Sequence, residues 1–116
     1  MKYEATESIT RAEALKRLRS ADPDDVCRAL VGIVHSDADW RWLQEQCSSL
    51  ARHESAQVRG LVATCFGHIA RLCGQLDLEA ARIVLRRLAL DPEVAGRVDD
   101  ALDDIQTYLG IRLDLA

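Results

Sequence analysis

Residues 55–73 read SAQVRGLVATCFGHIARLC, and this stretch decides the predicted fold. Its large apolar residues recur at the three- and four-residue spacing of one helix face. They are Val58, Leu61, Val62, Cys65, Phe66, Ile69, Leu72 and Cys73. The other side carries Gly60 and Gly67. A glycine inside a helix lowers the stability of the helix by up to about 1 kcal/mol relative to alanine. Two such glycines indicate a close helix neighbour, so we predict a helix covered on both sides, as in the middle of a stack.

Helix start and stop signals predict five more helices around this one. Both prolines follow an aspartate, at residues 22–23 and 91–92. Aspartate accepts hydrogen bonds from the free amides of a helix start, and proline at the first helical position loses no bond. Gly74 and Gly110 suit left-handed helix ends. The predicted helices span roughly residues 7–20, 23–35, 38–52, 55–73, 77–90 and 92–109.

Two of these helices have further capping signals. Thr10 and Glu13 have the spacing of a capping box. Ser36 or Asp37 can cap the third helix. Every gap between the helices is short, so neighbouring helices are expected to run antiparallel. The chain is therefore predicted to be all-α.

Three segments share one pattern, in which a turn with Asp or Ser is followed by Val and then by small and aliphatic residues. The valines of these segments are Val26, Val58 and Val94. The sequence intervals between these valines are typical of a helix pair that repeats along the chain. Three such pairs are about the minimum that buries a continuous core. We predict a single domain of three pairs, at approximately residues 7–35, 38–73 and 77–109, with a tail at 110–116.

Within the central repeat, the helix at 55–73 resembles the second helix of a HEAT repeat. The resemblance rests on Val58-Arg59 near the start, Ala63 four positions later, and Gly67-His68-Ile69 near the end. It implies a compact HEAT-like α-solenoid of about six antiparallel helices. In such a solenoid the second helix of each pair lines the inner surface. Asp24, Arg28, Arg71 and an aspartate row at 99–104 would then share one side.

The whole chain also resembles small bacterial HEAT-like immunity proteins of contact-dependent growth inhibition and related polymorphic toxin systems. This resemblance rests on size, repeat count and the segments DADWRWLQEQC (37–47) and GRVDDALDDI (96–105). It implies a protein-binding inhibitor without catalytic turnover. Its partner would be a cognate toxin, typically the C-terminal toxin domain of a larger effector.

The negative charge of the chain is concentrated at its C-terminal end. The formal net charge is −4, and residues 91–116 alone hold seven acidic and two basic residues. Four of the acids form a row on the sixth predicted helix: Asp99, Asp100, Asp103 and Asp104. They are either a solvated face partly neutralised by Arg82, Arg86 or Arg87 of the preceding helix, or a patch for a basic partner. A nuclease toxin is such a partner, because it binds phosphates, and opposite charge would speed its association.

Two tryptophans in the third predicted helix are candidates for the core or for an interface. Trp40 lies at the edge of the apolar stripe and is expected to pack in or over the core. Trp42 lies on a polar side of the helix. It is either a binding anchor, because Trp dominates interface hot spots, or it packs on a neighbouring helix pair or the N-terminal arm. Both interpretations of Trp42 remain open.

No catalytic or metal-binding motif stands out in the sequence. Cys65 and His68 have the spacing of one zinc-ligand pair, whereas structural zinc sites usually show two such pairs. Cys65 lies in the apolar stripe, where thiols are usually inert. His68 flanks that stripe, and we expect it to be partly buried with a satisfied hydrogen bond. We therefore expect no enzyme activity, no metal and no cofactor.

The sequence also bears on two other functions, those of an adaptor and a nucleic-acid-binding protein, and on the cellular compartment of the chain. A HEAT-type adaptor or scaffold in another bacterial complex is the alternative function, with the same fold and a different partner. Nucleic-acid binding is disfavoured by the acidic end, although a basic group is present at Arg11, Lys16, Arg17 and Arg19. Neither a membrane span nor an export signal is evident, so we expect a cytoplasmic protein whose four cysteines remain reduced.

Overall fold

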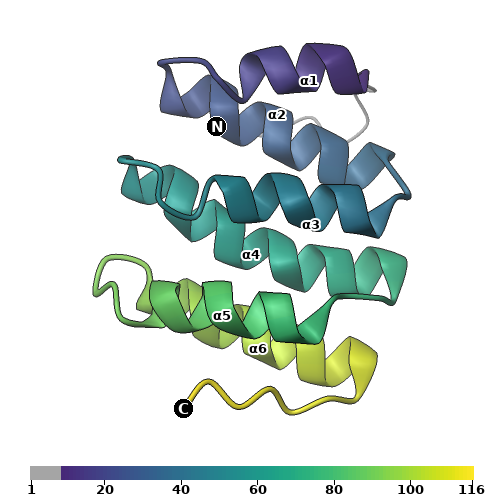
Figure 1. Cartoon of the computed structure of the whole chain (residues 1–116), viewed down its shortest axis with the longest axis vertical. Coiled ribbons are helices and arrows are strands. Elements are labelled where there is room, and N and C mark those ends of the chain that lie inside the picture. The colour runs from purple at the N-terminus through teal and green to yellow at the C-terminus, as the bar shows by residue number, and fades with distance from the viewer. Residues whose placement is uncertain (1–8) are drawn as a thin grey trace.

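The computed structural model describes residues 9–116, and within these residues the chain is all-α, with no strand. The helices are α1 (Arg11–Arg17), α2 (Pro23–Ser36), α3 (Trp40–Ser49), α4 (Ala56–Cys73), α5 (Leu78–Ala89) and α6 (Ala95–Leu109). They form three pairs, α1/α2, α3/α4 and α5/α6, stacked along the long axis of the molecule (Figure 1). The all-α prediction is confirmed. None of these helices has both the length and the apolarity needed to span a bilayer.

Several predicted helix boundaries are confirmed by their capping hydrogen bonds. The Asp22 carboxylate accepts a bond from the Asp24 amide at 3.0 Å, directly before Pro23. The Thr10 hydroxyl accepts a bond from the Glu13 amide at 3.2 Å, so the Thr10 half of the capping box is made. The start of the first helix, predicted at residue 7, lies outside the described residues. Both α4 and α6 end at a glycine in the left-handed region, Gly74 and Gly110, each with φ of 67°.

The predicted cap of the third helix is wrong. Asp39, and not Ser36 or Asp37, caps α3 by accepting a bond from the Trp42 amide at 3.3 Å. The two predicted residues are engaged elsewhere. The Ser36 hydroxyl donates to the Gly32 carbonyl of α2 at 2.7 Å, and the Asp37 carboxylate binds Arg11.

The predicted start of the sixth helix is also wrong. The Asp91 carboxylate accepts a bond from the Glu93 amide at 3.0 Å, which closes a turn instead of opening a helix. Val94 then leaves helical geometry, with φ of −127° and ψ of 0°, and α6 begins at Ala95. The other oxygen of Asp91 accepts a bond from Arg59 Nε of α4 at 2.9 Å. This contact fixes the turn before α6, and it joins residues far apart in sequence.

α4 is the centre of the stack, because it packs against α2, α3, α5 and α6. Its large apolar residues, such as Val58, Val62 and Phe66, are fully buried. Its glycines face α6: a Cβ on Gly67 would lie 2.6 Å from Asp104 Oδ2, and one on Gly60 would lie 3.5 Å from Arg97 Cγ. The prediction that a second helix approaches the small-residue side of α4 is confirmed.

Polar side chains join neighbouring helix pairs at a constant sequence separation of 33 residues. The buried Gln44 clamps the backbone of Asp77, donating to its carbonyl at 2.9 Å and accepting from its amide at 2.9 Å. The two other bonds at this separation run from Gln57 to Asp24 and from Arg97 to Thr64. Residues 33 apart in sequence therefore occupy matching positions in neighbouring helix pairs.

Candidate functional site

A polar stripe of α4 remains accessible between α2 and α6. Along this stripe the side chains of α4 meet polar side chains of both neighbours. We call the surface the α2/α4/α6 face, formed by Asp24 and His35 of α2, Gln57, Thr64, His68 and Arg71 of α4, and Arg97, Asp100 and Asp104 of α6. It brings together residues from all three helix pairs.

Four of the predicted site residues lie on this face, namely Asp24, Arg71, Asp100 and Asp104. Asp24 accepts a hydrogen bond from Gln57 Nε2 at 2.9 Å, which ties α2 to α4. Arg71 donates through one NH2 group to His68 Nδ1 at 3.3 Å. The Asp104 side chain packs over Gly67 of α4, and a larger residue at position 67 would occupy the same space.

The four aspartates of α6 lie in two different surroundings. Asp99 and Asp103 line an open hollow of ≈ 290 Å³ together with Arg112 and Leu113 of the C-terminal tail. Asp104 instead faces α4. Successive residues of a helix are rotated by about 100°, so Asp100 lies toward Asp104 and away from Asp99. Asp104 therefore lies beside α4, and Asp99 and Asp103 lie beside the tail. Asp100 and Asp103, three residues apart, remain neighbours between them.

Among the residues that the structure describes, no arginine of α5 pairs with these aspartates. Within residues 9–116, none of the four carboxylates forms an ion pair with a basic side chain. Arg82 pairs instead with Glu79 of its own helix, while Arg86 and Arg87 are exposed. Three of the aspartates are exposed as well, namely Asp99, Asp100 and Asp103.

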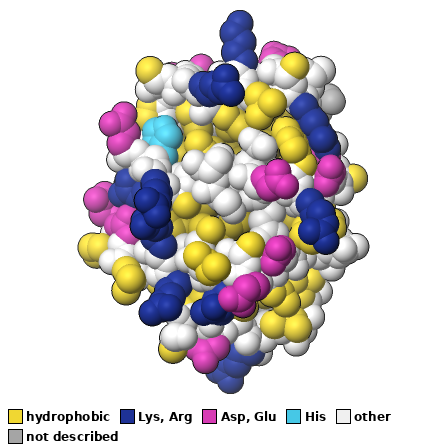
Figure 2. All heavy atoms as spheres, in the orientation of Figure 1, with side chains coloured by type: hydrophobic (Ala, Val, Ile, Leu, Met, Phe, Trp, Pro, Cys, Tyr) yellow, Lys and Arg dark blue, Asp and Glu magenta, His cyan; other side chains and the backbone are white. Residues whose placement is uncertain are grey.

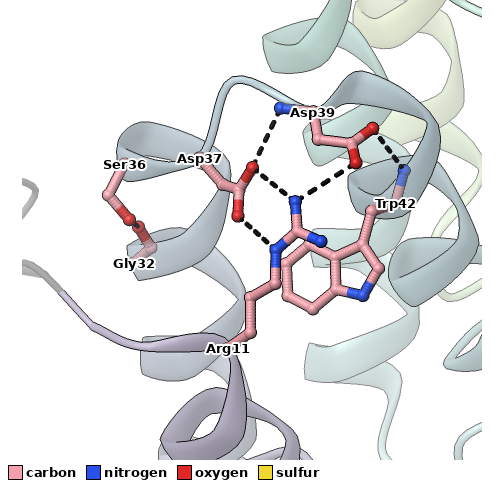
Figure 3. A network of polar contacts seen from close by, with 6 residues as sticks. All are labelled: Arg11, Gly32, Ser36, Asp37, Asp39 and Trp42. Carbon is pink, nitrogen blue, oxygen red and sulfur yellow. Dashed lines mark hydrogen bonds and ion pairs between the residues drawn. The ribbon is translucent and has the colours of Figure 1, made fainter.

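Trp42 lies at a different place, beside α1. The Arg11 guanidinium stacks over its ring at 4.3 Å and binds Asp37 and Asp39 at 2.8 Å and 3.2 Å (Figure 3). The guanidinium lowers the pKa of the Asp37 carboxyl below its ordinary value. The half-buried Trp42 therefore packs against a neighbouring helix, as one of the two interpretations expects. Arg11 is held by its contacts with Asp37, Asp39 and Trp42. A contact of Trp42 with a partner stays a prediction.

The other broad side of the molecule has mixed charge. Figure 2 shows Lys and Arg side chains interspersed with Asp and Glu among apolar residues, over the side on which α3 and α5 lie in front. An open hollow of ≈ 430 Å³ lies there, lined by Trp40, Arg41 and Ser48 of α3 and by Ala80 of α5. Its buried polar residue, Gln44, has its hydrogen bonds satisfied by Asp77.

His35 and His68 meet between α2 and α4, a pairing that the sequence reasoning missed. Their ring centroids are 5.6 Å apart. Partial burial lowers the pKa of His68 below its ordinary value, and nearby Arg71 and His35 lower it further, while Asp104 opposes the shift. His68 is half-buried with a hydrogen bond from Arg71, as predicted. The signal that could have found this pairing is the 33-residue separation of the two histidines in sequence. The hydrogen bonds between neighbouring helix pairs join residues at the same separation.

Cys65 and His68 do not converge as zinc ligands would. Cys65 is fully buried against Cys47 of α3. Its hydrogen bond with Cys47 and its burial raise the pKa of the thiol. His68 lies on the accessible α2/α4/α6 face. Within residues 9–116, no group of three or more His, Cys, Asp or Glu side chains is placed to hold a metal ion.

The histidine environment predicts how stability depends on pH. The folded-state pKa of His68 lies below the unfolded value of 6.5, so the unfolded chain binds more protons in this range. Stability should therefore fall as the pH drops below about 6.5. Urea denaturation of the wild type and of His68→Gln between pH 7.5 and 5.0 measures this. The wild type should lose more stability over this range than the variant, and equal losses would contradict the prediction.

Comparison with known proteins finds a similar solved structure. No family model matches the chain, and no curated protein sequence matches it. Among solved structures, a chain of the crystal structure of a CDI complex from Cupriavidus taiwanensis LMG 19424 is similar along almost its whole length. The two chains are 33% identical, the match covers 93% of this chain and 97% of the other, and the TM-score is 0.81.

Proposed function

Because this chain belongs to the same family as that component of the Cupriavidus taiwanensis CDI complex, we propose that it is an immunity protein that neutralises a cognate bacterial toxin. It binds the toxin stoichiometrically in the cytoplasm and performs no catalytic turnover. The match to a chain of a CDI complex, over 93% of this chain, is the observation that supports this function. The toxin of this proposal is a basic nuclease domain at the C-terminus of a larger effector.

The architecture that goes with this function is a HEAT-like solenoid. Its support is the regular stack of three helix pairs, with hydrogen bonds between residues 33 apart in neighbouring pairs. Stacked helix pairs present extended surfaces and are suited to binding another protein. The α2/α4/α6 face is one such surface, and it is contributed by the second helix of every pair.

The acidic surface of α6 is the proposed contact for the basic toxin. Asp99, Asp100 and Asp103 are exposed and have no ion-pair partner within the part of the chain that the structure describes. Their charge is therefore available to a partner. Opposite charges at an interface raise the association rate and favour the right partner.

Co-purification and growth rescue with the product of the neighbouring gene test the proposed function. We expect this product to co-purify with this chain in a 1:1 complex. Its expression in bacteria should stop growth, and co-expression of this chain should restore growth. Failure of both co-purification and rescue would contradict the proposal, whereas a complex with a non-toxic protein would favour the adaptor function.

Charge reversal on α6 tests the acidic contact. The double variant Asp100→Lys, Asp103→Lys should bind the toxin about tenfold or more weakly at low salt, since each 1.4 kcal/mol is tenfold in affinity. It should also lose most of the salt dependence of binding. Isothermal titration calorimetry at two salt concentrations measures both effects.

A matched control for this experiment is Glu45→Lys, Glu54→Lys. These two exposed glutamates lie on α3 and in the loop before α4, and their reversal changes the net charge equally. The control should retain nearly the wild-type affinity. Equal weakening of both double variants would show that only the net charge matters and would overturn the assignment to α6.

A further inference from the structure

Three nitrogen-bearing side chains converge at one place on the α2/α4/α6 face. The rings of His35 and His68 are 5.6 Å apart, and Arg71 NH2 lies 3.3 Å from His68 Nδ1. His35 and Arg71 are exposed, and His68 is half-buried. The cluster is thus accessible from solvent.

The hydrogen bonds of the cluster fix which ring nitrogens carry protons. A guanidinium can only donate, so His68 Nδ1 accepts from Arg71 and the neutral ring carries its proton on Nε2. A carbonyl can only accept, so His35 Nδ1 donates to Val31 O at 3.0 Å. Within residues 9–116, Arg71 forms no ion pair and His68 Nε2 has no acceptor. Two donors that favour an anion therefore face solvent together.

We propose that His68 and Arg71, with the His35 ring beside them, form an anion site that receives one carboxylate side chain, an Asp or Glu of the cognate toxin. This proposal rests on the proposed immunity function. His68 Nε2–H and the outer N–H groups of Arg71 donate to the carboxylate oxygens. Charge-assisted bonds of this type are stronger than neutral ones and are directional, so they fix the orientation of the toxin on the face.

The surrounding charges favour a single carboxylate over a nucleic acid. Asp104 of α6 lies near enough to His68 to act on its charge, and Asp100 precedes it by one helical turn. Asp24 lies on the same face, about three turns before His35 on α2. A phosphate chain crossing this face would meet those carboxylates and be repelled, and the chain as a whole carries a net charge of −4. A protein surface can place one acidic residue on the cluster and basic residues opposite the aspartates.

Binding of a carboxylate here is coupled to protonation. In the free chain, burial, Arg71 and His35 hold the pKa of His68 below its ordinary value, and Asp104 offsets this only in part. A bound carboxylate favours the protonated form of the His68 ring and so raises its pKa. The added proton is on Nδ1, so that nitrogen gives up its hydrogen bond from Arg71, and the guanidinium turns fully to the carboxylate. Proton uptake on binding means that affinity for the toxin increases as the pH falls from 7.5 toward 6.0.

The test measures the affinity of the full chain for the purified toxin by titration calorimetry. Arg71→Glu should weaken binding about tenfold or more, and Arg71→Lys should restore part of the loss. Arg86→Glu, at an exposed arginine of α5, is the control with the same charge change and should have little effect. The wild type should bind more tightly at pH 6.0 than at 7.5, and His68→Gln should lose this dependence.

The possible outcomes separate this inference from the proposed function. A complex that forms with wild-type affinity in Arg71→Glu, or that keeps its pH dependence in His68→Gln, overturns the anion site and leaves the immunity function standing. The absence of any complex with the wild type overturns both. Binding of a short single-stranded RNA to the free chain that is lost in Arg71→Gln would assign the cluster to phosphate and overturn the carboxylate.

Discussion

Gly67→Leu should destabilise the protein by about 3 kcal/mol, because it forces α4 and α6 apart at their closest contact. Even a bare Cβ at this position would lie 2.6 Å from Asp104 Oδ2 and 3.1 Å from Asp104 Cβ. The larger side chain cannot be accommodated by rotating Asp104 alone. Urea denaturation followed by circular dichroism measures the loss.

Two companion variants keep this prediction testable if Gly67→Leu does not fold. Gly67→Ala should show a smaller loss, and adding Asp104→Ala should recover part of it, since the clash is with the Asp104 side chain. Gly96→Ala is the control: a Cβ there meets nothing within 4 Å, so it should be neutral or stabilise by up to about 1 kcal/mol. A Gly67→Leu protein as stable as the wild type would contradict the close packing of α4 on α6.

Arg59→Met should cost about 2–3 kcal/mol, because it removes several charge-assisted hydrogen bonds at once. Arg59 Nε binds Asp91 Oδ2 at 2.9 Å, and its NH1 binds the carbonyls of His53 and Glu54 at 2.8 Å and 2.9 Å. Its side chain is only 17% exposed, so solvent screens these contacts poorly. The arginine joins the loop before α4 to the turn before α6.

The control for Arg59 is an arginine whose ion pair is local. Arg82→Met removes a surface pair with Glu79 within α5, and exposed pairs of this kind contribute little to stability because solvent screens them. Arg59→Lys should remain clearly destabilised, because an ammonium cannot bind Asp91 and two carbonyls in the same geometry. Similar midpoints of urea unfolding for Arg59→Met and Arg82→Met would contradict the role assigned to Arg59.

Local sequence signals were sufficient for most of the fold. The apolar stripe of residues 55–73 and its glycines predicted α4 and its close neighbour, and Asp22 and Gly74 marked helix ends that the structure confirms. These features depend on residues within a few positions of one another. They were therefore readable without knowing where the rest of the chain lies.

The failures arise where a distant residue competes for a local signal. Asp91 and Pro92 look like a helix start, but Arg59 holds Asp91 in a separate turn. Asp37 looks like a cap, but it binds Arg11 of α1.

The candidate site was predicted only in part for the same reason. Asp24, Arg71 and Asp104 were placed on one side correctly. The hollow that Asp99 and Asp103 line with Arg112 and Leu113 depends on the path of the tail, which no local pattern specifies. The pairing of His35 with His68 needs the register between two helix pairs.

The division of α4 into separate sides has an evolutionary consequence. Buried apolar residues and glycines hold the stack together, whereas positions such as Thr64, His68 and Arg71 contribute little to that core. Substitutions at these three positions can accumulate at low cost in stability. Related chains built on this scaffold can therefore differ at this surface, and so in the partner that they bind, while each remains folded.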